Sequence, residues 1–272
     1  MKKNIFSMIC AVGVCCSMLT GCDLIDYHPY DTKISGAHHI NSKNISLIEE
    51  RCANRDEVTF AVISDTQRWY DEMKVAVNSI NARTDIDFVV HCGDMSDFGP
   101  TKEFVLQRDI MQRLNVPYVV VIGNHDCLGT GADAYRYIFG DMNFSFNAGN
   151  THFVCLNTNA LEYDYSVPIP DFEFIRADRE NIPASVTHTV AVMHAMPHSE
   201  QFNNNVAEIF EQEVMKYPTL RFCLCGHDHS SKVLDLFGDG VSYYECGAAK
   251  RREYLVFTLK KDGGHSYEVV RY

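Results

Sequence analysis

The first half of the chain alternates continuous apolar runs with stretches whose apolar residues recur at helical spacing. The runs Val58–Ile63, Phe88–Val90 and Tyr118–Ile122 are rich in β-branched residues, as in strands buried on both faces. Between them, Met73–Arg83 and Lys102–Leu114 show the period of amphipathic helices. This alternation predicts parallel strands joined by crossover helices.

The second half carries shorter apolar runs separated by turn signals. Phe144–Phe146 and His152–Leu156 flank Asn147–Asn150, which predicts a hairpin. Further expected elements are the strands Thr187–Met193 and Leu220–Leu224, a helix near Val206–Lys216, and hairpins around Gly238–Gly240 and Lys261–Gly264. Parallel strands followed by antiparallel hairpins predict two packed sheets flanked by helices.

The N-terminus has the pattern of an export signal. Lys2 and Lys3 precede the uncharged stretch Ile5–Leu19, which is too short to span a bilayer. Leu19-Thr20-Gly21-Cys22 resembles a bacterial lipoprotein cleavage box with the Cys22 thiol as acyl acceptor; an ordinary secretory signal with an incidental cysteine is the alternative. We therefore expect a signal peptide at 1–21, a lipid anchor and tether at 22–40, and the folded domain at 41–272. The protein would be exported and lipid-anchored in the bacterial cell envelope, on the periplasmic or the outer-surface side.

Composition narrows the possible functions. The 272 residues include 36 acidic and 24 basic side chains, and a net charge of −12 argues against binding to a nucleic-acid duplex. An apolar fraction of 46% excludes a disordered chain. The sequence contains neither a Gly-x-Ser-x-Gly elbow nor a P-loop, which removes serine hydrolases and nucleotide-driven motors.

Seven of the 11 cysteines follow Cys22. They are Cys52, Cys92, Cys127, Cys155, Cys223, Cys225 and Cys246. Most lie in apolar runs and their number is odd, so we expect buried thiols rather than a disulfide framework. One disulfide remains compatible with export.

Five polar clusters follow predicted strands or lie at their ends. They are Asp65–Gln67, Gly93–Asp97, Gly123–Asp126, His194 and Gly226–His229. Because loops at the carboxyl ends of the strands of an open α/β sheet converge, we expect these clusters to meet. Their carboxylate, amide and imidazole groups suit divalent metals such as Mn, Fe, Co or Zn.

In order and spacing, these clusters resemble those of the calcineurin-like metallophosphoesterase superfamily, from about Val58 to His229. The resemblance implies an α/β protein, a four-layer α/β/β/α sandwich of two mixed sheets with a dimetal site at the C-terminal strand edges. It implies a metallophosphoesterase that cleaves phosphodiesters, diphosphates or phosphomonoesters by in-line attack of a dimetal-bound hydroxide. The substrate would be a phosphorylated small molecule. The alternative is a weak or inactive envelope protein that binds phosphorylated ligands without turnover.

The resemblance also assigns roles to individual residues. One cation would be held by Asp65, Gln67 and His229, and the other by Asn124, His194 and His227, with Asp94 bridging both. Two neighbouring cations repel, so an anionic bridge is needed, and their residual positive charge would attract phosphate to an acidic protein. His125 would protonate the leaving oxygen, and the Asp97 carboxylate would orient His125.

Two departures from the common family pattern refine this picture. Gln67 stands where many members have histidine, and its harder carbonyl oxygen favours Mn, Mg or Fe over Zn, with Mn first. Phe98 follows Asp97 where members acting on phosphoproteins usually have arginine, which argues against a specialised protein phosphatase. Arg68 and His198 are candidate phosphate contacts, with ordinary surface roles as the alternative. Nucleotide-type diesters or diphosphates come first among substrates and monoesters next.

Overall fold

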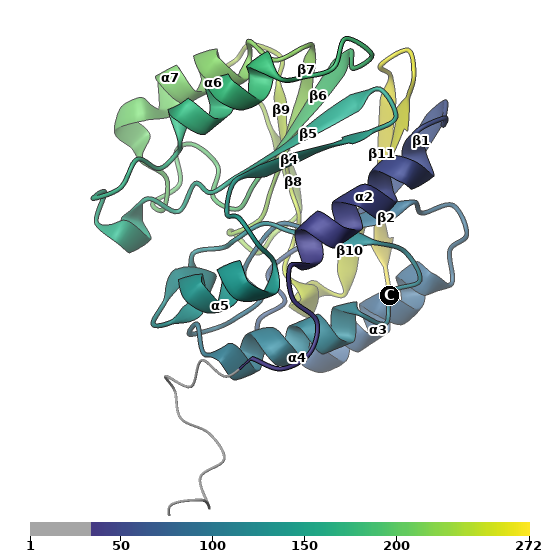
Figure 1. Cartoon of the computed structure of the whole chain (residues 1–272), viewed down its shortest axis with the longest axis vertical. Helices are drawn as coiled ribbons and strands as arrows, with labels where there is room; N and C mark the ends of the chain where they lie inside the picture. The colour runs from purple at the N-terminus through teal and green to yellow at the C-terminus, as the bar shows by residue number, and fades with distance from the viewer. Residues whose placement is uncertain (1–33) are drawn as a thin grey trace, which may run out of the picture. The chain divides into compact units, whose positions relative to one another are not determined.

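A computed structural model describes residues 34–272 of the chain. The predicted signal peptide and most of the predicted tether, including Cys22, lie outside these residues. Within the described part, two mixed sheets pack face to face and helices cover their outer faces (Figure 1). The predicted fold class, two mixed sheets flanked by helices, is confirmed. No helix within residues 34–272 is both long enough and apolar enough to cross a membrane.

The first sheet has the strand order β11-β10-β1-β2-β3. Its strands are β1 (Glu57–Ile63), β2 (Phe88–His91), β3 (Tyr118–Val120), β10 (Glu253–Lys260) and β11 (His265–Arg271). The strands β1, β2 and β3 are parallel, as predicted, and β10 joins β1 antiparallel. The predicted hairpin between β10 and β11 therefore extends the first sheet.

The second sheet has the order β4-β5-β6-β7-β9-β8. Its strands are β4 (Phe144–Ala148), β5 (Thr151–Leu156), β6 (His188–Met193), β7 (Leu220–Cys225), β8 (Lys232–Leu234) and β9 (Ser242–Glu245). The hairpins β4–β5 and β8–β9 are antiparallel as predicted, but they form only the two edges. The central strands β5, β6, β7 and β9 are parallel, because helices connect β5 to β6 and β6 to β7.

Six α-helices lie in the described part of the chain. They are α2 (Ile40–Cys52), α3 (Tyr70–Asn81), α4 (Thr101–Met111), α5 (Gly131–Ile138), α6 (Phe172–Glu180) and α7 (Ala207–Val214). The predicted helices correspond to α3, α4 and α7, with ends shifted by a few residues, whereas α5 and α6 were not predicted. Helix α6 begins after Asp171, whose carboxylate accepts hydrogen bonds from the main-chain N–H groups of Glu173 and Phe174.

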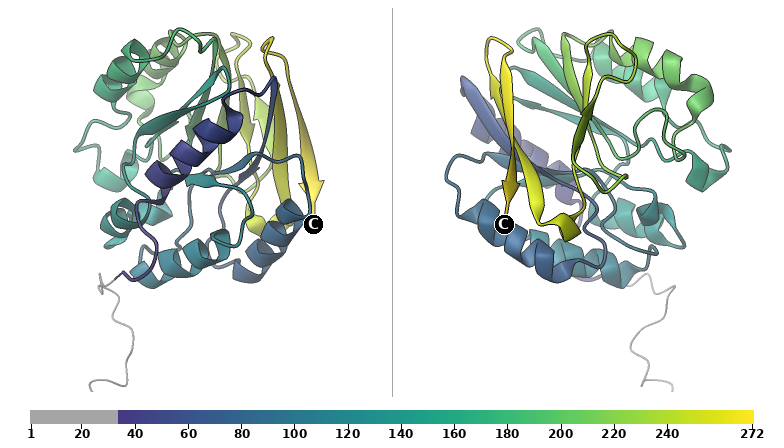
Figure 2. Two further views of the ribbon diagram at one scale, coloured as in Figure 1. Left: turned by 45° about the vertical axis from the view of Figure 1, so that its right-hand side comes forward. Right: turned by 180° about the vertical axis from the view of Figure 1, so that it is seen from behind.

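Apolar side chains form one layer between the sheets and one layer outside each of them. On β1, Phe60 and Val62 point toward the second sheet, while Ala61 and Ile63 pack toward the helices α3 and α4. The ring of Phe60 meets that of Phe153 on β5 edge to face, with centroids 5.3 Å apart. In Figure 2 the green helices α6 and α7 and the blue helices α3 and α4 lie on opposite sides of the sheets. The central strands are thus buried on both faces, which explains their uninterrupted apolar sequences.

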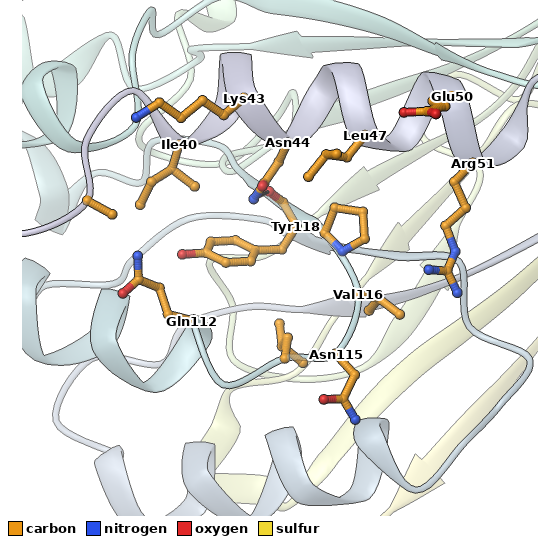
Figure 3. A pocket seen from close by; sticks show the side chains of 13 residues that line it. Ile40, Lys43, Asn44, Leu47, Glu50, Arg51, Gln112, Asn115, Val116 and Tyr118 are labelled. Atoms are coloured by element: carbon orange, nitrogen blue, oxygen red, sulfur yellow. Dashed lines mark hydrogen bonds between the residues drawn. The ribbon is translucent and has the colours of Figure 1, made fainter.

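Helix α2 covers β3, the edge strand of the first sheet. The Asn41 side chain donates to the carbonyl of Val120 at 2.9 Å and accepts from its N–H at 3.0 Å. Asn44 donates to the carbonyl of Tyr118 at 2.7 Å. A hollow of about 760 Å³ lies beneath α2, next to the loop that precedes β3 (Figure 3). None of the predicted site residues lines this hollow. The role of α2 here is to provide hydrogen-bond partners for the main-chain groups at the edge of β3.

Candidate metal centre

The predicted clusters meet where strands of both sheets end. Main-chain contacts join the two sheets at this place: Ser64 after β1 forms a parallel bridge with Ala248 after β9, and the Ala249 N–H donates to the Asp65 carbonyl at 3.3 Å. Within the second sheet, the Gly226 N–H after β7 donates to the His194 carbonyl after β6 at 3.0 Å. All seven predicted metal ligands are brought into one connected group. The sequence prediction that these clusters converge is therefore confirmed.

Three of the predicted ligands gather around one amide oxygen. Asn124 Oδ1 lies 3.0 Å from His194 Nε2 and 3.1 Å from His227 Nδ1. The other ring nitrogen of His194, Nδ1, donates to the Cys92 carbonyl at 2.7 Å. This second contact fixes the imidazole and leaves Nε2 directed at the site.

In the other predicted set, His229 contacts Asp65 and Gln67 contacts Asp94. His229 Nε2 lies 3.3 Å from Asp65 Oδ1, and the His227 N–H donates to Asp65 Oδ2 at 3.2 Å. Asp94 lies between the two sets, with one carboxylate oxygen, Oδ2, 3.3 Å from Gln67 Nε2 and 3.4 Å from His194 Nε2. The structure thus places Asp94 where the resemblance assigns a bridging ligand.

Strained backbone supports this arrangement. Asp65, Asp94, His227 and His229 have φ values between 51° and 84°, in the left-handed region. Such a conformation costs a non-glycine residue about 1–3 kcal/mol and is kept only where the surrounding structure enforces it. Four of the seven predicted ligands therefore sit on backbone that the fold holds at some cost to stability.

Asp126 anchors the main chain beneath the site, a role that the sequence did not reveal. Its buried carboxylate accepts hydrogen bonds from the N–H groups of Asp94, Met95, Ser96 and Gly123, at 2.8–2.9 Å. Burial and the neighbouring Asp94 raise the pKa of Asp126 to about 7, while these N–H donors favour the carboxylate form. Its motif, Gly-Asn-His-Asp, placed it at the site but gave no sign that it clamps two loops.

The donor atoms fit a divalent metal centre. Asp65 Oδ1 and Gln67 Oε1 are buried, and neither accepts a hydrogen bond among residues 34–272, although His229 Nε2 lies 3.3 Å from Asp65 Oδ1. Ligand atoms of Asp65, Asp94 and His194 lie within 4.8 Å of one another, and all three residues are buried. Unpartnered buried oxygens are costly, and a cation shared by these oxygens and imidazoles would satisfy them.

The electrostatics of the buried pair agree with this interpretation. Burial alone would raise the pKa of Asp94 and lower that of His194, but their mutual attraction wins, so the pKa of Asp94 falls and that of His194 rises. The pair therefore retains a proton on the imidazole. A metal ligand must be deprotonated, so a bound cation would take the place of that proton.

His125 lies beside the predicted ligands, and Asp97 contacts its ring mainly through the main chain. Its Nδ1 lies 2.7 Å from the main-chain carbonyl of Asp97 and 3.9 Å from the Asp97 carboxylate. The carboxylate also forms an ion pair with Arg68. Asp97 therefore meets His125 as predicted, but the closer contact is its main-chain carbonyl, and its carboxylate, which also pairs with Arg68, lies at the outer limit of an ion pair with the ring.

A cleft of about 530 Å³ opens beside the site. It is lined by Gln67, Arg68, Trp69, Asp97, His125, His229, Ala248, Lys250 and Arg251. Arg68 is therefore near the predicted substrate position, although paired, whereas His198 is exposed, packs against Phe237 and does not line the cleft. Trp69, Lys250 and Arg251 were missed, because no sequence pattern links the turn after β9 to the end of β1.

The cysteine prediction is confirmed for the described residues. All seven thiols after Cys22 are free, and six of them are buried. Burial raises the pKa of Cys223 and Cys225 well above the usual range, so these thiols stay protonated. They belong to the apolar layer outside the second sheet rather than to a metal site.

A glycine substitution tests how closely the loops must approach. A Cβ on Gly226 would lie 2.0 Å from Ser64 Oγ and 2.8 Å from Asp65 Oδ2. We expect Gly226→Ala to displace Asp65 and to reduce bound Mn²⁺ from about two ions per chain to fewer than one, measured by plasma mass spectrometry of the dialysed protein. Gly264→Ala, whose Cβ would meet its nearest atom, Asp262 Oδ1, at 3.2 Å in a surface turn, is the matched control. Equal metal content in the two variants would contradict the prediction.

Curated relatives share modest identity with this chain. A protein of Xenorhabdus bovienii named "Probable cyclic nucleotide phosphodiesterase" is 24% identical over 193 residues, which cover 66% of this chain and 75% of that protein. A 3′,5′-cyclic-nucleotide phosphodiesterase of Nostoc is 23% identical over 155 residues, 54% of this chain and 57% of that protein.

Solved structures share the fold. A dimetal phosphatase from Danio rerio has a TM-score of 0.58 at 12% identity, covering 79% of this chain and 99% of its own. A purple acid phosphatase from yellow lupin has a TM-score of 0.58 at 13% identity, covering 79% of this chain and 54% of its own. The profile of the calcineurin-like phosphoesterase family matches residues 58–231, which span β1 to the His227–His229 loop and so include every predicted ligand. The chain belongs to the calcineurin-like phosphoesterase family.

Proposed function

We propose that this chain hydrolyses phosphodiesters or diphosphates, with phosphomonoesters next, and that it uses two divalent cations, preferably Mn²⁺. The observation that carries the proposal is the arrangement of six donor side chains in two sets of three on either side of a seventh donor, the Asp94 carboxylate. Asp65, Gln67 and His229 form one set, and Asn124, His194 and His227 form the other.

Two cations, when bound, supply a Lewis acid for the phosphoryl group and lower the pKa of a coordinated water. The protein's part is to hold the ligands in place and to limit their mobility. His194 is fixed through the Cys92 carbonyl, and Asp94 through the four N–H groups that converge on Asp126. Such preorganisation reduces the reorganisation needed in the transition state.

His125 is placed to assist the leaving group. Since the Asp97 carbonyl can only accept a hydrogen bond, it holds the proton on Nδ1, and Nε2 is left for the cleft that His125 lines. A protonated His125 would donate from Nε2 to the departing oxygen. The main-chain N–H of the same residue donates to Asp94 Oδ1 at 3.0 Å, which ties this acid to the proposed bridging ligand.

The choice of substrate rests on two observations. Gln67 supplies a neutral, hard oxygen in place of an imidazole, which suits Mn²⁺. Two of the relatives are named as cyclic nucleotide phosphodiesterases, which supports a phosphodiester ahead of a monoester. Cyclic nucleotides therefore belong in the first substrate panel, together with linear diesters and diphosphates.

Two substitutions separate metal binding from chemistry. The Mn²⁺-loaded wild type should hydrolyse bis(p-nitrophenyl) phosphate. Asp94→Asn should lose metal and activity together, because it removes the charge shared by both ligand sets. His125→Gln should keep its metal and slow turnover by about 10²–10⁴-fold, the usual contribution of one acid–base group. Metal content and steady-state rates, measured on the same preparations, check both expectations.

His198→Gln is the control for these variants, because His198 is exposed and outside the cleft. It should match the wild type in metal content and rate. Parallel loss of metal in His125→Gln would contradict the role assigned to that residue. A fully metallated wild type that hydrolyses no phosphate mono- or diester would favour a protein that binds phosphorylated ligands without turnover.

We further propose that the protein is exported and anchored by lipid on Cys22, with residues 1–21 removed as a signal peptide. The uncharged stretch Ile5–Leu19 and the box Leu19–Cys22 support this proposal. The enzyme would then act on phosphate esters in the cell envelope, on the periplasmic or the outer-surface side.

Replacement of the acyl acceptor tests the anchor. Cys22→Ser should prevent incorporation of radiolabelled palmitate. It should also leave an unprocessed precursor, because in this pathway the Cys22 thiol is acylated before the signal peptide is cleaved. Pulse-labelling followed by membrane fractionation measures both effects. A Cys22→Ser protein that is still cleaved and still membrane-bound would rule out lipidation at this residue.

A further inference from the structure

The cleft beside the predicted metal ligands has a basic wall. Arg68, Lys250 and Arg251 line it, and Asp97 is the single acidic side chain in the lining. The Asp97 carboxylate is already paired with Arg68. The positively charged side chains of Lys250 and Arg251 therefore have no acidic partner in the cleft.

Neither residue is neutralised elsewhere in the described part of the chain. No carboxylate among residues 34–272 forms an ion pair with Lys250 or Arg251, although the adjacent Arg252 pairs with Glu72 at 3.6 Å. The Lys250 ammonium lies over the Trp69 ring, 5.1 Å from its centroid. The Arg251 guanidinium donates through Nε to the main-chain carbonyl of His229, so its remaining N–H groups are available to a ligand.

The wall is fixed relative to the predicted metal ligands. Lys250 and Arg251 belong to a short 3₁₀ turn, Ala249–Arg251, directly after the Ser64–Ala248 bridge. The Ala249 N–H donates to the carbonyl of Asp65 at 3.3 Å. On the far side of the turn, the N–H of Tyr272 donates to the Arg252 carbonyl at 3.0 Å. The two cations are thus carried on backbone that is tied to a predicted metal ligand, which limits the ordering that a ligand must bring about.

A substrate with a single phosphate would leave Lys250 and Arg251 without an anionic group to bind. The reacting phosphate of the proposed reaction would sit at the predicted metal ligands, where two divalent metal ions, when bound, would neutralise it. A cyclic nucleotide carries no second anionic group that Lys250 and Arg251 could bind. A diphosphate ester places a second phosphate one bridging oxygen away from the first, within the reach of two long, flexible cationic side chains.

We propose that Lys250 and Arg251 form a subsite for a second phosphate, and that this phosphoesterase therefore prefers diphosphate esters, such as nucleoside diphosphate derivatives, to esters with a single phosphate. The proposal rests on the proposed hydrolase function and specifies its substrate class. Trp69 acts as a positioning residue, because its ring holds the Lys250 ammonium over the cleft.

The experiment compares two esters on the full-length, Mn²⁺-loaded protein. Thymidine diphosphate glucose carries two phosphates, and the p-nitrophenyl ester of thymidine monophosphate carries one. The double variant Lys250→Gln/Arg251→Gln should lower kcat/KM for the diphosphate by about 10²- to 10⁴-fold, since each of the two lost hydrogen bonds to a charged group is worth about 10- to 100-fold. Most of the change should appear in KM. The monophosphate ester should change by less than about threefold.

Control variants separate this subsite from a general loss of charge or of folding. Arg252→Gln also removes a positive charge from this segment, but Arg252 pairs with Glu72 and does not line the cleft. Both esters should therefore keep their wild-type kinetics. Trp69→Leu should raise KM for the diphosphate, and Trp69→Phe, which keeps an aromatic face, should restore much of the loss. Metal content and thermal unfolding of every variant should match the wild type.

The outcomes distinguish the two proposals. If the wild type hydrolyses both esters and the double variant leaves their ratio of kcat/KM unchanged, the subsite is wrong while the hydrolase function stands. An equal fall for both esters would also overturn the subsite, because it would show a general electrostatic effect. If the wild type hydrolyses neither of them nor any other phosphate ester, the hydrolase function fails and the subsite fails with it.

Discussion

The burial of two carboxylates, Asp65 and Asp94, at the point where the two sheets join is the constraint on which the rest of the structure depends. Their exposed fractions are 0% and 1%. Removing a carboxylate from water is expensive unless opposite charge and hydrogen-bond donors compensate it. Without bound metal, His194 lies against Asp94 and His229 lies against Asp65. Main-chain N–H groups donate further hydrogen bonds to both carboxylates. Two divalent cations would complete this compensation, which is why we interpret the same residues as a metal centre.

The fold makes this burial possible by bringing strand ends together. The strands β1, β2 and β3 are parallel within one sheet, and β6 and β7 are parallel within the other, so the loops that follow them can meet at one edge. Asp126 joins two of these loops through four main-chain hydrogen bonds. Asp65 and Asp94 both adopt the left-handed conformation in these loops, and both carboxylates are buried there. The strained backbone and buried charges of the site therefore destabilise the folded state, and the burial of apolar side chains between and outside the sheets offsets this cost.

Much of the site could be predicted from the sequence because its motifs are local. Each predicted ligand follows a buried apolar run, and such a run is readable as a strand without knowledge of its neighbours. The parallel centre of the second sheet could not be predicted in this way, because strand direction depends on the helices between the strands. Helix α5 was not predicted although its buried residues, Gly131, Ala134, Tyr135 and Ile138, recur at helical spacing, and α6 was not predicted because Asp171 was assigned no capping role.

The contacts made by tertiary structure were the least predictable. The resemblance assigned the Asp97 carboxylate to His125, but the carboxylate also pairs with Arg68 and the main-chain carbonyl makes the closer contact to the ring. Lys250 and Arg251 lie far along the chain from Asp65, and only the bridge between Ala248 and Ser64 brings them to the cleft. Neighbours of this kind follow from the pairing of strands rather than from any local pattern.

The central claim is that Asp94 joins two ligand sets, each of which holds one cation. Anomalous diffraction at the manganese edge, on crystals of the wild-type protein equilibrated with Mn²⁺, tests it most directly. The account predicts two anomalous peaks per chain, both within bonding distance of the Asp94 carboxylate, one beside Asp65 and His229 and the other beside Asn124 and His194. A single peak, or two peaks that do not share Asp94, would contradict it.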